Sequence, residues 1–356
     1  MRKILTIAVV AMLGIALATP LMAQPDLQFP GLKQPRTSPV AWAGQTFGVT
    51  DVEVTYSRPA VNERTIWGGL VPYDQVWRTG ADENTTITFS TDVTVEGKAL
   101  AAGTYGLHTI PGEDSWQVIF SNDSDAWGSY SYDEANDALR VTVTPAAAPH
   151  AENFTVAFAD VNNESVDVVL HWAELAVPVT IGADTHALAL ASFESELKGV
   201  DAFFWRGWNQ AAQYVLNNDL EVAKGLEFVE QSIQTEERWQ NLSTKAQLLE
   251  KSGDSEGANE VWAQAFPKAT AGQLYFLGQQ LLGRGEVERA AEVAQKNAQL
   301  NPDAWIVPVG LARVASAEGK LDVAKEHLEK ALEDVPDNNR SAVQGLLVQV
   351  TNGQSI

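Results

Sequence analysis

The stretch VDVVLHWAELAVPVTI, residues 166–181, lies where the pattern of the sequence changes. Apolar and polar residues alternate at 166–172 and again at 177–181, which is typical of β-strands. After Ile181 the apolar residues follow a helical spacing, and alanine, glutamine, leucine and glutamate predominate. We therefore expect a β domain at residues 41–182, followed by an all-α domain at residues 183–350.

The same alternation recurs upstream of this stretch. It begins near Gln45 with Val49, Val52, Val54 and Tyr56. Further candidate strands lie at residues 86–89, 93–95, 103–110, 116–121, 139–144 and 154–159, and turn residues separate them at 96–98, 111–114 and 162–163. Eight or nine short strands without intervening helices predict an antiparallel β-sandwich, jelly-roll-like, or a barrel. The order of the strands stays open.

Small residues recur at regular intervals in the helical part. One series is Ala211, Ala246, Gly278 and Ala312, at spacings of 35, 32 and 34 residues, and a second series follows it 12 residues later at Ala223, Ala258, Ala290 and Ala324. Two close-packed antiparallel helices need small residues where they touch, and a period near 34 with this layout resembles the tetratricopeptide repeat. The first unit, residues 203–233, is the least regular and is expected to act as a cap.

The amino-terminal end has the features of a secretory signal peptide. Arg2 and Lys3 precede residues 4–17, which carry no charge and are too few to span a bilayer. We expect residues 1–23 to be removed after Ala23, with Ala18 as the alternative, and residues 24–40 to form a proline-rich linker. The protein is therefore expected to be periplasmic or secreted, and the absence of cysteine excludes lipid attachment through that residue.

Charge and composition exclude several classes of partner. The chain has 356 residues and a net charge of −22, which becomes −24 once Arg2 and Lys3 are lost. Such a field repels nucleic acids and anionic membrane surfaces. No further membrane span is expected after the signal is cleaved. Without cysteine there are no disulfides, so packing alone must hold the fold together.

Catalytic and metal-binding patterns do not withstand inspection. Residues 253–257, GDSEG, match a nucleophile elbow, but that motif needs a strand before it, and here it falls between two expected helices. The histidines have no short metal-binding spacing; they are His108, His150, His171, His186 and His327. The acidic turn at 123–125 places Trp127 where a calcium loop needs a ligand. No metal and no cofactor are expected.

Polar and aromatic side chains are concentrated in the β domain, where acidic residues outnumber basic ones by 21 to 7 between residues 24 and 182. The candidate ligand-binding residues are Arg58, Arg64, Trp67, Trp77, Arg78, Asn84, Tyr105, Trp127, Tyr130 and Tyr132. Arginine beside tryptophan can stack on the ring or clamp a carboxylate. Glu83 and His108 are the candidates for proton transfer. The alternative is structural, with arginines paired to Asp82 or Glu83 and tryptophans closing the sandwich.

These residues lie within segments that resemble a known family. The segments are Ser-Arg-Pro (57–59), Ile-Trp-Gly (66–68), Val-Pro-Tyr (71–73), Val-Trp-Arg-Thr-Gly-Ala (76–81), Glu-Asn-Thr-Thr (83–86), Ala-Gly-Thr-Tyr-Gly-Leu-His (102–108) and Trp-Gly-Ser-Tyr-Ser-Tyr (127–132). Together, over residues 38–182, they resemble exported bacterial proteins grouped as domain of unknown function 2911. Residues 62–64, Asn-Glu-Arg, depart from that pattern. The resemblance implies an exported β-rich domain and supplies no activity or catalytic residue.

Three functions follow from these observations. The first is a non-catalytic module of the cell envelope, whose β domain binds a small ligand, glycan or peptide and whose repeats bind a protein. The second is a hydrolase or lyase acting on envelope polymers through Glu83 and His108, with Arg58 or Arg78 stabilising negative charge. The third is a structural envelope component. The sequence favours binding over catalysis and leaves the ligand and the oligomeric state open.

Overall fold

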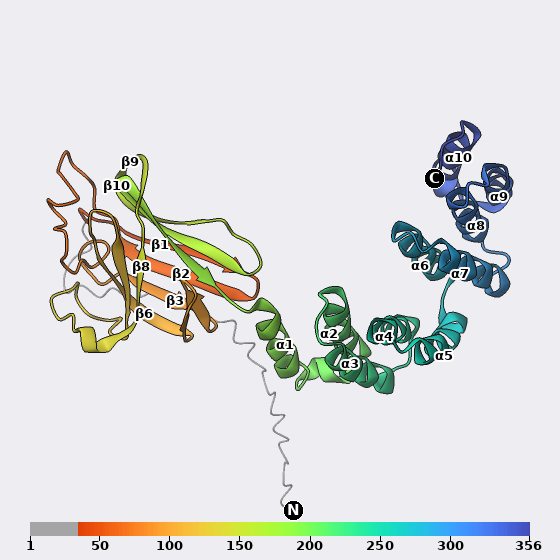
Figure 1. The fold of residues 1–356 in the computed structure, drawn as a ribbon, viewed down its shortest axis with the longest axis horizontal. Helices are drawn as coiled ribbons and strands as arrows, with labels where there is room; N and C mark the ends of the chain where they lie inside the picture. The colour runs from red at the N-terminus through yellow and green to blue at the C-terminus, as the bar shows by residue number, and fades with distance from the viewer. Residues whose placement is uncertain (1–34) are drawn as a thin grey trace, which may run out of the picture. The chain divides into compact units, whose positions relative to one another are not determined.

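A computed structural model describes residues 35–356 and divides the chain into two units, with the boundary in the sequence between Ala183 and Asp184 (Figure 1). The expected signal peptide and most of the expected linker lie outside the described residues. Across residues 35–356, every helix is too short or too polar to cross a bilayer.

The first unit is built from two antiparallel sheets. Its strands are β1 Val40–Phe47, β2 Thr50–Ser57, β3 Thr86–Phe89, β4 Val93–Val95, β5 Lys98–Leu100, β6 Gly103–Ile110, β7 Trp116–Ser121, β8 Asp137–Val143, β9 Ala146–Ala159 and β10 Ser165–Gly182. One sheet has the order β1-β2-β3-β6-β7-β8 and the other β5-β4-β10-β9. This confirms the antiparallel β fold expected from the sequence.

The two sheets share one hydrophobic core. Leu107 and Phe120 of the larger sheet and Leu170 and Ile181 of the smaller sheet line the same interior void of about 10 Å³. A void of this size leaves this part of the interior close-packed.

The strand boundaries differ from the expectation in several places. A strand, β5, begins at Lys98, where a turn was expected, and β8 and β9 begin at Asp137 and Ala146 instead of at residues 139 and 154. Val49 was expected in a strand but lies in the turn between β1 and β2. The first strand, β1, begins at Val40, which was expected to be the last residue of the linker. The expected strands at 166–172 and 177–181 form one continuous strand, β10, with irregular pairing between His171 and Leu175. Ala173 has φ of +50° there, and Trp172 and Ala173 are both buried. A bulge of this kind interrupts the alternation without ending the strand.

Four tryptophans pack together in the core beside the irregular segment 58–85. Trp67 and Trp77 come from that segment, Trp116 from β7 and Trp172 from β10. The Trp67 ring centroid lies 4.8 Å from that of Trp116 and 5.9 Å from that of Trp172, and Trp77 stacks on Trp172 at 5.9 Å. These contacts fix a segment that has little regular hydrogen bonding of its own.

The second unit consists of helices. They are α1 Thr185–Glu196, α2 Trp205–Asn217, α3 Val222–Thr235, α4 Trp239–Ser252, α5 Ser255–Ala265, α6 Ala271–Gly283, α7 Val287–Leu300, α8 Ile306–Ala317, α9 Leu321–Asp334 and α10 Asp337–Thr351. Short 3₁₀ turns lie at Glu134–Asn136 in the first unit and at Val200–Phe203 and Phe266–Lys268 in the second. Successive helices from α2 to α9 pack in pairs, as a tetratricopeptide-like repeat requires (Figure 1).

The expected small residues are buried at the helix contacts, with one exception. Ala246, Ala290, Ala312 and Ala324 are fully buried, but Ala223 is exposed. Gly225, two residues later, is buried in its place, and a Cβ at this position would lie 2.8 Å from Leu248 Cδ2. The small residue of the first unit is therefore Gly225, and the assignment of Ala223 was wrong.

The turn between α4 and α5 contains the sequence GDSEG. Gly253 ends α4 with φ of +87°, and Asp254 Oδ1 accepts a hydrogen bond from the Gly257 amide at 2.9 Å to begin α5. No strand precedes Ser255 within the described helical unit. These glycines and polar residues make an inter-helix turn, as the sequence indicated.

Candidate functional site

The family segments around β6 and the loop at 121–136 meet at His108. His108 lies on β6, is buried, and its Nδ1 is 3.0 Å from Ser129 Oγ. The Tyr132 ring lies 5.3 Å from the His108 ring. The contact joins the Gly-Leu-His segment to the Trp-Gly-Ser-Tyr segment, which lie 21 residues apart in the chain.

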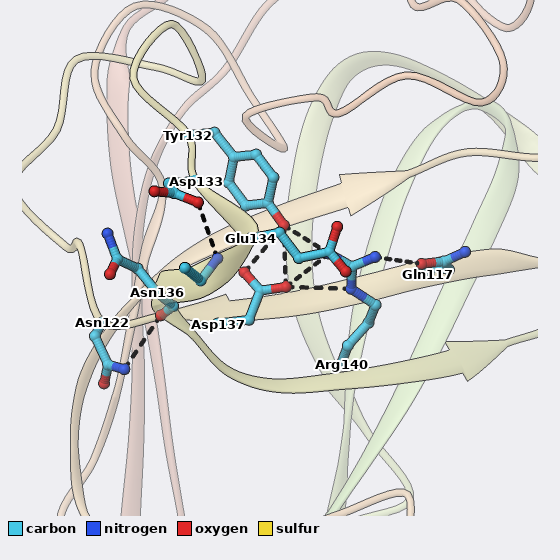
Figure 2. Close-up of polar contacts among 9 residues, drawn as sticks. Gln117, Asn122, Tyr132, Asp133, Glu134, Asn136, Asp137 and Arg140 are labelled. Carbon is cyan, nitrogen blue, oxygen red and sulfur yellow. Dashed lines mark hydrogen bonds and ion pairs between the residues drawn. The ribbon is translucent and has the colours of Figure 1, made fainter.

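Tyr132 is held in a polar network at the start of β8 (Figure 2). Its hydroxyl donates to Asp137, whose two carboxylate oxygens both lie 3.0 Å away, and accepts from Arg140 Nη2 at 2.7 Å. Arg140 also pairs with Asp137 at 2.7 Å and donates to Gln117 Oε1 at 3.1 Å. Burial, followed by the hydrogen bond to Asp137, raises the pKa of Tyr132 to about 12. Tyr132 therefore stays neutral and anchors the loop next to His108.

Arg78 contacts the same loop at Gly128 and Tyr130. Its Nη1 donates to the Asp82 carbonyl at 2.9 Å, and its guanidinium lies 5.0 Å from the centroid of the Tyr130 ring. The Gly128 backbone approaches Arg78 so closely that a Cβ there would lie 2.6 Å from Arg78 Cζ. Tyr130 is 82% exposed and Trp127 52% exposed, so two aromatic side chains of the loop are open to solvent.

Glu83 and Asn84 belong to neighbouring but different contacts. Glu83 forms an ion pair with Arg36, which also pairs with Asp82 at 3.1 Å. Asn84 Nδ2 donates to the Asp123 carbonyl at 3.0 Å, whereas its Oδ1 is buried with no partner among the described residues. The charged groups that act on His108 are Asp137, Arg78 and Asp123, and Glu83 is not among them. The two proton-transfer candidates therefore lie in separate polar groups.

The remaining candidates make contacts within the β domain. Arg58 donates to the Phe154 carbonyl at 3.0 Å and to Thr155 Oγ1 at 2.8 Å, tying segment 58–85 to β9. Arg64 donates to the carbonyl oxygens of its own segment at Ala60 and Val61. Trp67 and Trp77 lie in the tryptophan cluster, and the Tyr105 hydroxyl donates to the Ala101 carbonyl at 2.9 Å. No hydrogen bond or ring contact joins any of these residues to His108.

Four residues of this region were missed by the sequence analysis. Ser129 lies inside a family segment but was not singled out, while Asp137 and Arg140 follow in a strongly acidic stretch. Arg36 was placed in the linker. One available signal was the arginine at 140 in a domain that has few bases, because an isolated base among carboxylates commonly forms an ion pair. Within residues 35–356, no group of three or more His, Asp or Glu side chains is arranged to hold a metal ion.

The helical unit contains a second candidate site, a hollow of about 400 Å³ on the first helices of three successive pairs. Its lining residues are Gln213, Leu216 and Asn217 of α2, Trp239, Gln240, Ser243, Thr244 and Gln247 of α4, Gln273, Phe276, Leu277 and Gln280 of α6, and Arg284. We call this the amide groove. The helices α2, α4 and α6 lie along one side of the stack (Figure 1).

A larger hollow of about 680 Å³ lies where the helical unit begins. It includes Phe204, Trp205 and Arg206 next to the 3₁₀ turn Val200–Phe203, and Glu236 and Arg238 before α4. Charges of both signs line it, and Arg238 is already paired with Glu236. This hollow offers fewer unpaired polar groups than the amide groove.

The comparisons with known proteins match the two units separately. Residues 38–181 match the family described as Protein of unknown function (DUF2911). A search of curated proteins found no match. Similar solved structures include the APC/C hetero-tetramer Cut9-Hcn1, at 17% identity over 46% of this chain and 33% of that chain, with a TM-score of 0.29. YrrB, a TPR protein with an unusual peptide-binding site, is 13% identical over 45% of this chain and 82% of that chain, with a TM-score of 0.27. MamA is 17% identical over 41% of this chain and 85% of that chain, with a TM-score of 0.28.

The chain thus spans about a third of the length of the first of these structures. Residues 38–181 thus match the model of the DUF2911 family that the β-domain segments resemble, and the paired helices that follow have the layout of a tetratricopeptide-like repeat.

Proposed function

We propose that this chain is a protein-interaction module of the cell envelope, whose helical domain holds an extended peptide segment of a partner in the amide groove. A domain of unknown function joined to tetratricopeptide-like repeats fits a protein-interaction module. The observation that carries the proposal is the composition of the groove, in which side-chain amides from α2, α4 and α6 lie together.

Amide side chains suit the backbone of an extended peptide. Each glutamine offers two N–H donors and a carbonyl acceptor, which match the C=O and N–H groups of a peptide bond. Among the described residues, the amides of Gln213, Gln240 and Gln280 make no hydrogen bond, whereas Gln247 and Gln273 bond within their own helices. The three free amides are therefore available to a ligand.

One apolar and one charged side chain give the groove further selectivity. Phe276 is 64% exposed although it is large and aromatic, and Arg284 is the one charged residue that lines the groove. We infer that the partner segment has an apolar side chain that covers Phe276 and few positive charges. Because most contacts would be uncharged, the affinity should change little with salt.

Selection of peptides from a random display library on the full chain tests this proposal. Phe276→Ala in the groove is compared with Phe203→Ala, an exposed phenylalanine outside it. Burying an aromatic side chain contributes about 1.5–3 kcal/mol, so Phe276→Ala should weaken the selected peptides about tenfold or more. Gln240→Ala should weaken them too, and Phe203→Ala should leave them unchanged. Equal effects of Phe276→Ala and Phe203→Ala would show that the peptides bind elsewhere.

For the β domain we propose binding of a small ligand or glycan at the exposed loop of Trp127 and Tyr130. Sugars stack on aromatic faces, and Arg78 lies beneath Tyr130 to bind polar groups. Quenching of Trp127 fluorescence by glycans, lost in Trp127→Phe, is the expected result. A glycan series that neither quenches Trp127 nor raises the melting temperature would rule this surface out.

Export supports the assignment to the envelope. The proposal rests on the basic start and short apolar run of residues 1–17. Amino-terminal sequencing of the protein recovered from the producing cells should begin at Gln24. An intact amino-terminal Met1 would contradict export by cleavage.

A further inference from the structure

A serine and a histidine are paired in the β domain without any assigned role. Ser129 Oγ lies 3.0 Å from His108 Nδ1, a distance that fits a hydrogen bond. Ser129 is partly exposed, whereas His108 is buried beneath the loop. A hydroxyl of a partly exposed serine within hydrogen-bond reach of a buried imidazole is the pairing that an activated serine nucleophile needs.

The surroundings of His108 keep the imidazole neutral. Burial is the largest effect and lowers the pKa of His108, and the charge of Arg78 lowers it further, whereas Asp137 and Asp123 act in the opposite direction. Tyr132, which packs against the ring, is held neutral by its own network. A neutral His108 with its proton on Nε2 accepts the Ser129 hydroxyl proton at Nδ1 near pH 7.

Arg78 brings a positive charge to the same loop. Its guanidinium packs against Gly128, the residue immediately before Ser129, and is held there by the Asp82 carbonyl. Arginine cannot lose its proton at ordinary pH, so it stabilises an oxyanion that forms beside Ser129. Nucleophile, base and cation thus come from the loop at 121–136, from β6 and from segment 58–85.

We propose that Ser129 is a nucleophile that hydrolyses carboxylic esters, with His108 as general base and Arg78 stabilising the oxyanion. Ser129 Oγ attacks the carbonyl carbon while its proton passes to His108 Nδ1. The tetrahedral oxyanion then collapses, the bond to the alkoxy oxygen breaks, and His108 returns the proton to the departing alcohol. Water, deprotonated by His108, attacks the acyl-serine, and the carboxylic acid leaves as Oγ recovers its proton.

The substrate class follows from the surroundings of Ser129. The β domain is strongly acidic, so a neutral ester is favoured over an anionic one. Tyr130, the next residue, exposes its ring to solvent and can stack on the face of a sugar. We infer an acyl ester carried on a glycan; this part rests on the ligand surface proposed above, whereas the serine chemistry does not.

Labelling with a fluorophosphonate, which phosphorylates activated serines, tests the nucleophile in the full chain. The adduct should form at Ser129, located by peptide mapping, and p-nitrophenyl acetate should be hydrolysed. Ser129→Ala should abolish both, and Ser131→Ala, an exposed serine two residues later, should change neither. His108→Gln should slow labelling about 100-fold or more, the usual contribution of a general base, while His150→Gln, an exposed histidine, should leave the rate unchanged.

Each result decides the matter. An unlabelled Ser129 in folded protein, or equal losses in Ser129→Ala and Ser131→Ala, would overturn the proposal. If His108→Gln unfolds the domain, Ser129→Ala still provides the test, because its fold is checked by circular dichroism. Glycan binding is measured separately, so labelled Ser129 without glycan binding rejects only the ligand surface, and glycan binding without labelling rejects only the esterase.

Discussion

Replacement of Gly128 by alanine should destabilise the β domain through two separate effects. Gly128 has φ of +64°, a left-handed conformation that costs an L-residue about 1–2 kcal/mol. The new Cβ would also lie 2.6 Å from Arg78 Cζ, so the guanidinium must move. Its hydrogen bond to the Asp82 carbonyl would then be weakened, and because the guanidinium is the end of a flexible, partly exposed side chain, this adds only about 0.5–1.5 kcal/mol. We expect a total loss of about 1.5–3.5 kcal/mol in the free energy of unfolding.

Gly97→Ala is the matched control. Gly97 has φ of +74° in the turn between β4 and β5, and a Cβ there would meet nothing within 4 Å. This variant should lose only the conformational contribution of about 1–2 kcal/mol. Pulse proteolysis of the full chain in urea, read on β-domain peptides by mass spectrometry, gives both values. Equal losses in the two variants would refute the packing of Arg78 on Gly128.

Two further predictions concern the helix contacts and the tyrosine network. Gly225→Ala should destabilise the helical domain, because overpacking against Val215 and Leu248 costs about 1–3 kcal/mol, which is more than the gain in helix propensity. Gly278→Ala has open space around its Cβ and should stabilise the domain by about 0.5–1 kcal/mol. Unfolding followed by circular dichroism at 222 nm measures both changes. Tyr132 has its pKa raised to about 12 from 10.0, so it favours the folded state below pH 10 and this contribution is lost as the pH rises from 10 to 12. Absorbance at 295 nm follows the ionisation of Tyr132. Tyr132→Phe should remove this part of the pH dependence of stability. An unchanged dependence in that variant would contradict the raised pKa of Tyr132.

The division into a β domain and a helical domain could be read from the sequence because the two periods differ. β10 ends at Gly182, one residue after the point where alternation stops. The bulge at Ala173 could not be read, since a break in alternation looks the same whether the chain bulges or turns away. Ala223 and Gly225 present a similar ambiguity, because both are small and only packing against Leu248 decides which one is buried.

Some contacts of the candidate site join residues that the sequence singled out. Arg78 lies against Tyr130, and His108 lies against Tyr132, although the residues of each pair come from different family segments. The pairing of Glu83 with Arg36 spans 47 residues and depends on where β2 places the preceding segment, which no local pattern records. Asp137 and Arg140 lie in an acidic stretch that is equally typical of a solvated loop, so their network with Tyr132 became visible only in three dimensions.

The tryptophan cluster has an optical consequence. Among Trp67, Trp77, Trp116 and Trp172, five of the six ring pairs have centroids between 4.8 and 6.4 Å apart. At such separations excitation passes among indoles faster than any of them emits, so the four behave as one chromophore. Whichever ring absorbs the light, emission comes from the tryptophan with the lowest excited-state energy. Replacing that tryptophan would therefore change the emission of the whole group. Trp127 lies outside this cluster, and because its side chain is 52% exposed, its emission wavelength depends on solvent, as does that of Trp42, which is 74% exposed.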